Sequence, residues 1–307
     1  AEARHGLAAV LAKLGRFDEA LPHYRKIPNV PGALIEMARV LIDKNLRLKP
    51  EERKWDEVNQ VLNRVSQDED NLIDVLLTRS DMLVIQNQLE QAKAILDRAS
   101  QRDPGNVRLW VVRANLHLRG ENRAAAQKVL EEAEQTVGRR SELFLARMYY
   151  WTSGDAEVAV KAIRKMELQR QEYPELAQEA ILTGLAVAYA RAGDTKSSER
   201  LLTKLAQQSP HGLPVRRRLL SLALIRGDFK RASKLIAEIR KIEGHDGIYW
   251  RLAQASLDIA RARRGALNHL VEARELTLEV RDLLANSPRV AVLLGQIDLL
   301  SGDEENA

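Results

Sequence analysis

One short pattern recurs along this chain at intervals of 33 to 39 residues, and it constrains the fold more than any other feature of the sequence. The pattern is a glycine, a second residue two positions later that is often aromatic, a small residue at five, and large apolar residues at nine and twelve. Its clearest copies begin at Gly15, Gly193 and Gly227, and looser copies begin at Asn87, Gly120 and Gly154. This spacing is typical of repeats that each fold as a helix, a turn and a second helix.

Each copy has the residue types that a turn between two helices needs. Glycine or asparagine accepts the left-handed backbone that ends a first helix, and the acidic residues that follow suit the positive end of a second helix. The small residue lets the two helices approach closely, and its copies are Ala20, Ala92, Ala126, Ala159, Ser198, Ala232 and Ala266. Prolines separate successive repeats, at Pro28, Pro104, Pro210 and Pro288. Strong helix formers abound and only 4% of residues are aromatic, so the sequence predicts an all-α chain.

Three segments fit the pattern best: KLGRFDEALPHYRKI, ARAGDTKSSERLLTKL and LIRGDFKRASKLIAEI. On these residues the chain resembles the tetratricopeptide-repeat (TPR) family over essentially its whole length. The resemblance implies an α-α superhelix, a solenoid of antiparallel helix pairs. We expect residues 1–307 to form one such solenoid, with about eight hairpins and the first helix of a ninth. Insertions near 45–53 and 167–174 lengthen two turns, and the repeat near Trp250 lacks the turn glycine.

The last copy of the pattern begins at Gly302 and stops at Ala307, where the sequence ends. We therefore expect a fragment of a longer protein, cut after the first helix of its ninth hairpin. Such a helix would lack its partner, so the sequence predicts that Leu293, Leu294 and Leu300 are partly uncovered. Uncovered apolar side chains would favour self-association through this end.

No motif in the sequence points to catalysis or to a cofactor. The chain has no phosphate-binding Gly-Lys loop, no His-Glu-x-x-His pair and no Gly-x-Gly-x-x-Gly turn, and without cysteine it has no zinc–thiolate site. His269, Glu272 and Glu275 come nearest to a ligand set, but solvation of a helix surface explains their one-turn spacing. We expect a soluble, non-enzymatic chain with no cofactor, no metal and no transmembrane segment. The sequence assigns no compartment.

Positive charge is concentrated between residues 200 and 279. That span holds sixteen Lys and Arg and eight Asp and Glu, hence 16 − 8 = +8, against +5 for the whole chain. Its densest part is the run Arg216, Arg217 and Arg218. A solvated face, an acidic protein partner, and a nucleic acid or anionic membrane surface all remain open. The run lacks the interleaved aromatic residues on which single-stranded nucleic acids stack, so the sequence favours a protein partner.

The resemblance also implies where a partner would bind, because first helices line the concave side of a TPR superhelix. Aligning these helices on their turns places eight residues there: Asn115, Arg119, Phe144, Met148, Arg191, Arg217, Arg218 and Arg251. Some family members grip a terminal carboxylate with lysine and asparagine residues. Of that arrangement only Asn115 is matched, since Val111 replaces the cation one turn earlier. The carboxylate grip is therefore not carried over.

What remains is a groove that is apolar at Phe144 and Met148 and basic toward Arg217 and Arg251. It suits an acidic peptide with apolar anchors, and the alternative is that these arginines only pair with neighbouring acids. The function expected is a non-catalytic protein-interaction scaffold. The alternatives are a binder of nucleic acid or an anionic surface, and a non-catalytic adaptor within a larger enzyme or secretion component.

Overall fold

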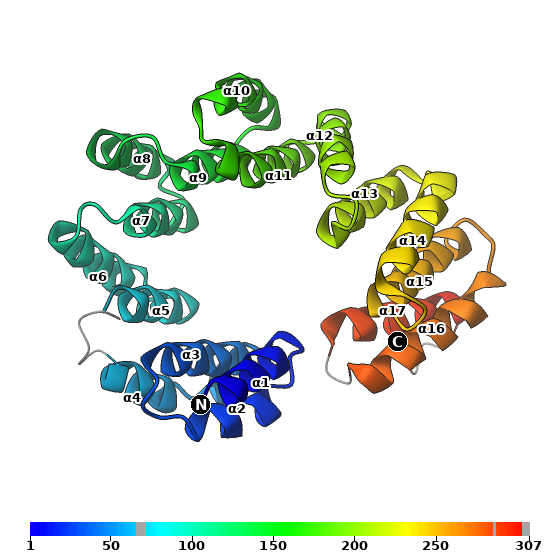
Figure 1. The fold of residues 1–307 in the computed structure, drawn as a ribbon, viewed down its shortest axis with the longest axis horizontal. Helices are drawn as coiled ribbons and strands as arrows, with labels where there is room; N and C mark the ends of the chain where they lie inside the picture. Colours follow the sequence, from blue (N-terminus) through cyan, green and yellow to red (C-terminus); the bar gives the residue numbers. More distant parts are fainter. Residues whose placement is uncertain (66–71, 285–286, 303–307) are drawn as a thin grey trace. The chain divides into compact units, whose positions relative to one another are not determined.

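The structure is a computed structural model that describes residues 1–65, 72–284 and 287–302. Over these residues the chain consists of α-helices and two short 3-10 helices, with no β-strand (Figure 1). The all-α prediction is confirmed. Within the described part of the chain, no helix combines the length and the apolar character that crossing a lipid bilayer requires.

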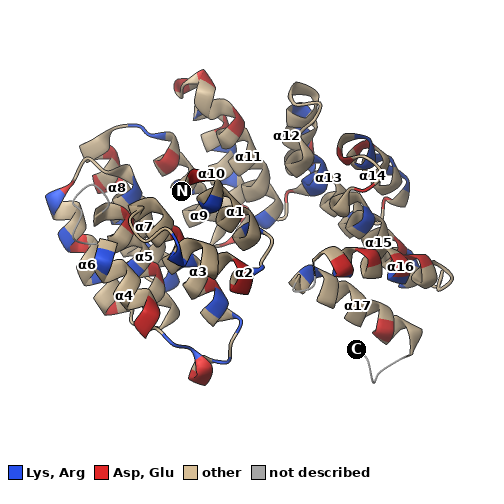
Figure 2. Ribbon diagram, turned by 60° about the horizontal axis from the view of Figure 1, so that its bottom comes forward, with Lys and Arg blue, Asp and Glu red and all other residues tan. Residues whose placement is uncertain are grey.

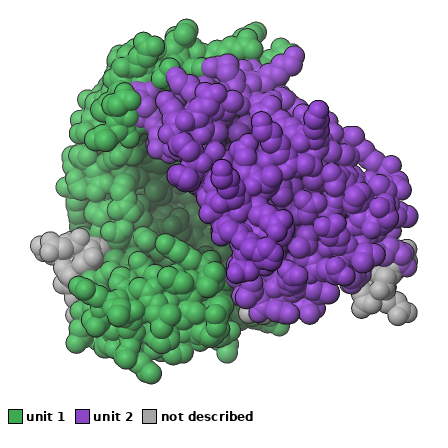
Figure 3. All heavy atoms as spheres, turned by 45° about the vertical axis from the view of Figure 1, so that its right-hand side comes forward, with its two compact units in different colours: residues 1–177 green, residues 178–307 purple. Residues whose placement is uncertain are grey.

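The chain divides into two compact units, residues 1–177 (unit 1) and residues 178–307 (unit 2), coloured separately in Figure 3. The boundary lies near the start of α11 (Glu175–Arg191). A single solenoid over the whole length stays a prediction, and each unit is described by itself.

Unit 1 is built of helix pairs. In chain order they are α1 (Glu2–Lys13) with α2 (Phe17–Arg25), α3 (Pro31–Leu46) with α4 (Asp56–Val65), α5 (Leu72–Ile85) with α6 (Leu89–Arg102), α7 (Val107–Arg119) with α8 (Arg123–Val137), and α9 (Ser141–Thr152) with α10 (Ala156–Gln169). The first helices also contact one another in sequence, α1 with α3, α3 with α5, α5 with α7 and α7 with α9. Each predicted insertion holds a 3-10 helix, η1 (Pro50–Glu52) after α3 and η3 (Arg170–Glu172) after α10.

Unit 2 repeats the arrangement. After α11 come α12 (Thr195–Gln208), the pair α13 (Leu213–Arg226) and α14 (Phe229–Glu243), the pair α15 (Ile248–Ala262) and α16 (His269–Leu283), and α17 (Pro288–Ser301). The first helices α13, α15 and α17 contact one another in turn. They therefore form one continuous layer, and α14 and α16 pack against it.

The left-handed backbone predicted at the turns is present where five copies of the pattern begin: Gly15, Asn87, Gly193, Gly227 and Gly302. The prediction is wrong for Gly120 and Gly154. The left-handed residue of the first of these turns is Glu121, with a φ of 57°, and Gly154 does not have a positive φ. The prediction is also wrong for the repeat near Trp250. That repeat does have a turn glycine, Gly265 with a φ of 100°, and the sequence comparison misses it because the connection to α16 is longer than in the other hairpins.

The predicted small residues lie between paired helices. Five alanines and one serine at this position are almost fully buried, with at most 1% of their surface exposed: Ala20, Ala92, Ala126, Ala159, Ala232 and Ser198. Ala266 is the exception, because it is only half-buried and precedes α16. Its place is taken by Ala273, which has no exposed surface. The longer turn after α15 shifts the buried position along the chain.

The helix α17 packs more fully than the sequence suggests. Leu293 is buried, so the prediction that it is uncovered is wrong; it joins the core that α17 shares with α15 and α16. Leu294 and Leu300 are half-buried, whereas Val292 and Leu299 are exposed. Self-association stays a prediction, and the final residues, including Ala307, lie outside the described residues.

Enlarging a buried small residue should destabilise its hairpin. Ala126→Leu in α8 is expected to lower the free energy of unfolding by about 1–3 kcal/mol or more, because close-packed helices have no room for the added atoms. Ala124→Leu is the matched control, since Ala124 lies in the same helix and is exposed. Urea unfolding monitored by circular dichroism would measure both. Equal stability of the two variants would contradict close packing at this position.

Candidate functional site

The apolar end of the predicted groove is covered by the chain itself. Phe144 and Met148 lie on α9 and are each only 3% exposed. The ring of Tyr173, which follows η3, lies 4.8 Å from the ring of Phe144. The predicted insertion near 167–174 therefore packs onto this first helix, and we correct the prediction: the two side chains belong to the core.

The other two predicted residues of unit 1, Asn115 and Arg119, lie on α7. The Oδ1 atom of Asn115 is buried and has no hydrogen-bond partner in the described residues. Arg119 is exposed and borders a pocket of about 490 Å³ together with Arg39, Asp43 and Asp81 of α3 and α5. Burial raises the pKa of both aspartates, while Arg119 and then Arg39 act to lower that of Asp81. Because both signs of charge line this pocket, it favours neither an anion nor a cation.

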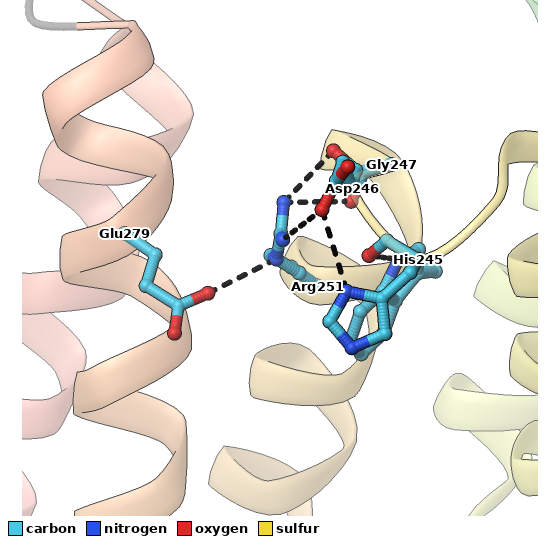
Figure 4. A network of polar contacts seen from close by, with 6 residues as sticks. His245, Asp246, Gly247, Arg251 and Glu279 are labelled. Atoms are coloured by element: carbon cyan, nitrogen blue, oxygen red, sulfur yellow. Dashed lines mark hydrogen bonds and ion pairs between the residues drawn. The ribbon is translucent and has the colours of Figure 1, made fainter.

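In unit 2, Arg251 is a structural residue. It is 8% exposed, and its Nη1 atom donates to the main-chain oxygens of Asp246, at 2.8 Å, and Gly247, at 3.4 Å. Its Nε lies 3.0 Å from the carboxylate of Glu279 on α16 (Figure 4). At this position the alternative interpretation, that the arginine pairs with neighbouring acids, is confirmed. Arg251 is therefore no longer a candidate for binding a partner.

Arg216 has the same role in the preceding repeat, a role that was not predicted from the sequence. It is also 8% exposed, and its Nη1 donates to the main-chain oxygens of Ser209 and Gly212, each at 3.2 Å. Its Nε donates to Glu238 on α14 at 3.2 Å. Arg216 and Arg251 are both the fourth residue of a first helix. The repeat register thus identifies a structural arginine that joins the preceding turn to the second helix.

The next two residues of the run face a pocket. Arg217 and Arg218 line a hollow of about 300 Å³ together with Leu224 of the same helix, Tyr249 and Ala253 of α15, and Arg289 of α17. The basic run on α13 is blue in Figure 2. No acidic residue lines this hollow, and in the described chain none of its three arginines forms an ion pair with a carboxylate. We call it the arginine pocket.

The side chains of the arginine pocket constrain one another. The guanidinium carbon of Arg217 lies 4.2 Å from the centre of the Tyr249 ring, a cation–π contact. Burial and, after it, the charge of Arg217 lower the pKa of Arg289, and Tyr249 acts in the opposite direction. Two positive groups therefore lie close together, with no described acidic residue between them.

Arg289 was not among the predicted groove residues, although its position in the repeat is equivalent to that of Tyr249. It is the second residue of α17, as Tyr249 is of α15, so the two side chains occupy the same place on successive first helices. The predicted residue Arg191 ends α11, is exposed, and makes an interaction within the chain. Of the eight predicted residues, the arginine pocket brings together only Arg217 and Arg218.

A cluster of possible metal ligands also lies in unit 2. Ligand atoms of Asp258, His269 and Glu272 are within 4.8 Å of one another, with Asp258 in place of the Glu275 considered from the sequence. The buried Asp258 accepts a hydrogen bond from Arg261 at 3.0 Å, and His269 Nδ1 lies 3.4 Å from the same oxygen. Since Arg261 already supplies a positive charge there, we assign no metal to this cluster.

One family model matches part of this chain. Residues 83–144 match a family model described as tetratricopeptide repeat, and none of the curated proteins matches the chain. A solved tetratricopeptide repeat protein from Parabacteroides merdae is 16% identical over 87% of this chain and 98% of its own, with a TM-score of 0.48.

Two further solved structures are similar to the chain. PilW, a type IV pilus biogenesis factor, is 16% identical over 72% of this chain and 97% of its own, with a TM-score of 0.48. A thermophilic TPR protein from Thermus thermophilus is 18% identical over 73% and 98%, with a TM-score of 0.40. At these values the similarities assign neither a partner nor a process.

Truncating the structural arginine should destabilise unit 2, whereas truncating a pocket arginine should not. Arg251→Ala leaves two main-chain oxygens and Glu279 without their donor, so we expect a loss of about 1–3 kcal/mol in the free energy of unfolding. Arg218→Ala, at an exposed position, is expected to change it by less than about 0.5 kcal/mol. Urea unfolding of both variants tests the assignment, which fails if the two losses are equal.

The pocket of unit 1 that Asp81 and Arg119 border should make the stability of the protein depend on pH. Because burial raises the folded-state pKa of Asp81, its contribution to stability is full at low pH and is lost as pH rises through that pKa. Asp81→Asn should therefore raise the urea midpoint near neutral pH and leave it unchanged below about pH 3.9, the ordinary pKa of aspartate. A lower midpoint at neutral pH would show instead that Arg119 and Arg39 dominate.

Proposed function

Because this chain is a tetratricopeptide-repeat protein, we propose that it is a non-catalytic scaffold that binds a short acidic segment of a partner protein on the first helices of unit 2. Stacked helical repeats generally present extended binding surfaces to other macromolecules, and the repeat fold is typically non-catalytic. The observation that carries the proposal is the arginine pocket, in which three cations from two first helices lack an acidic partner among the described residues.

The composition of the pocket selects the partner's chemistry. Guanidinium groups that lack a carboxylate attract one from outside, and such complementarity gives specificity and faster association. Leu224 and Ala253 add apolar surface beside the charges, so an apolar side chain next to the acid has a place to pack. An acidic peptide with an apolar anchor, as the sequence predicts, fits this combination.

A binder of nucleic acid or an anionic surface is the alternative. Single-stranded nucleic acids stack their bases on exposed aromatic side chains. The pocket has one aromatic residue, Tyr249, and the guanidinium of Arg217 lies against its ring. This arrangement favours a peptide over a nucleic acid.

Neutralising the pocket should remove binding. In the variant Arg217→Gln, Arg218→Gln and Arg289→Gln, the affinity for a short fluorescein-labelled peptide that alternates glutamate with leucine is expected to fall by about tenfold or more, roughly 1.4 kcal/mol. Fluorescence anisotropy measures this loss. Arg251 stays unchanged in the experiment, because its loss would disturb the fold.

The control variant removes the same charge elsewhere in unit 2. Lys230→Gln, Lys241→Gln and Arg263→Gln alter exposed residues that do not line the pocket, so peptide affinity should change less than about threefold. Equal losses in the two variants would show that net charge alone attracts the peptide. A single-stranded oligonucleotide that binds more tightly than the peptide, and weakens steeply with salt, would support the alternative.

A further inference from the structure

The arginine pocket extends along α13 from Pro214 to Leu224 and includes residues near the starts of α15 and α17. Tyr249 and Arg289 are the second residues of α15 and α17, and Arg217 is the fifth residue of α13. The N-terminal end of a helix carries a partial positive charge from its aligned peptide dipoles. At the starts of α15 and α17 these partial charges have the same sign as the arginine side chains.

The fold holds one of these arginines, Arg217, in place before an anion arrives. Arg216, one position before Arg217, is fixed by the preceding turn and by Glu238, which sets the rotation of α13 about its axis. Arg217 is then held against Tyr249 of the next first helix. Side chains restrained before binding lose less conformational entropy when a ligand arrives.

Charge balance decides which anion suits the pocket. A carboxylate brings one negative charge, whereas three guanidinium groups meet here without an acidic residue in the lining. A phosphoryl group brings about −1.5 to −2 charges and three strong acceptor oxygens. Guanidinium groups bind such oxygens through paired, parallel hydrogen bonds. A phosphoryl group therefore matches both the charge and the donors of the pocket better than a carboxylate does.

We propose that the arginine pocket recognises a phosphorylated serine or threonine in the partner segment, with Arg217, Arg218 and Arg289 as the phosphate-binding residues. The inference rests on the proposed function at the same face. It adds a regulatory consequence: the partner binds tightly only after a kinase has modified it.

The test uses one peptide sequence in three forms, with serine, glutamate or phosphoserine at its centre between leucines. Fluorescence anisotropy with the full chain should give affinities that rise from serine to glutamate to phosphoserine, the last step by about tenfold. The preference for phosphoserine should weaken as pH falls through about 6, where the phosphoryl group gains a proton. Glutamate keeps its charge in that range.

Two variants assign the preference to the pocket. Arg218→Lys keeps the charge and loses the paired donors, so we expect it to reduce binding of the phosphoserine form more than that of the glutamate form. Arg289→Gln should abolish the preference, whereas Lys241→Gln, which alters a residue outside the pocket, should preserve it. Circular dichroism of each variant shows that the fold is unchanged.

The outcomes separate the two proposals. If glutamate and phosphoserine peptides bind equally and both depend on the pocket arginines, the proposed function stands and the phosphoryl inference is overturned. If neither peptide binds, both are overturned. If inorganic phosphate displaces the phosphopeptide at the peptide's own affinity, or a single-stranded oligonucleotide binds more tightly than it, the assignment to a phosphorylated protein segment is overturned.

Discussion

The close approach of two helices at a buried small side chain is the constraint on which every hairpin depends. Where Ala126 or Ala232 lies between paired helices, no part of its surface is exposed, so the second helix packs against the backbone of the first. This contact fixes the distance and the rotation of the pair. The rotation in turn decides which residues of the first helix face the neighbouring first helices, and therefore which side chains a partner can reach.

The sequence predicts the helix pairs well because their determinants are local. A small residue, a turn residue with a left-handed backbone and a proline between repeats each act within a few positions, so a single sequence displays them. The misses come from places where the spacing changes. After α15 the connection is longer, so Ala273 replaces Ala266 at the buried position. Periodicity cannot reveal such a shift, because the residues themselves still fit the pattern.

The candidate site is less predictable, since exposure depends on contacts between distant residues. Phe144 has the right register for a groove residue, yet Tyr173 covers it, and only the folded insertion shows this. Arg251 has the right charge, yet two main-chain oxygens and Glu279 occupy its donors. Arg289 follows a proline in an otherwise apolar segment and attracts no notice until α17 packs beside α15. Charge and register identify candidates, and packing decides among them.

Arg216 and Arg217 are adjacent in the chain but have different roles: Arg216 binds the preceding turn, and Arg217 lines the pocket. They differ because successive residues of an α-helix are rotated by about 100° about its axis. The deletion of a single residue at the start of α13 would shift this register by one position: Arg217 would take the buried place of Arg216, and Arg216 would take the place of Val215, which is also buried. Evolution of this surface is therefore tied to the length of the turn before α13. Substitutions at Arg217 and Arg218 change side chains that line the pocket, whereas insertions or deletions in residues 209–212 would displace the main-chain oxygens to which Arg216 donates.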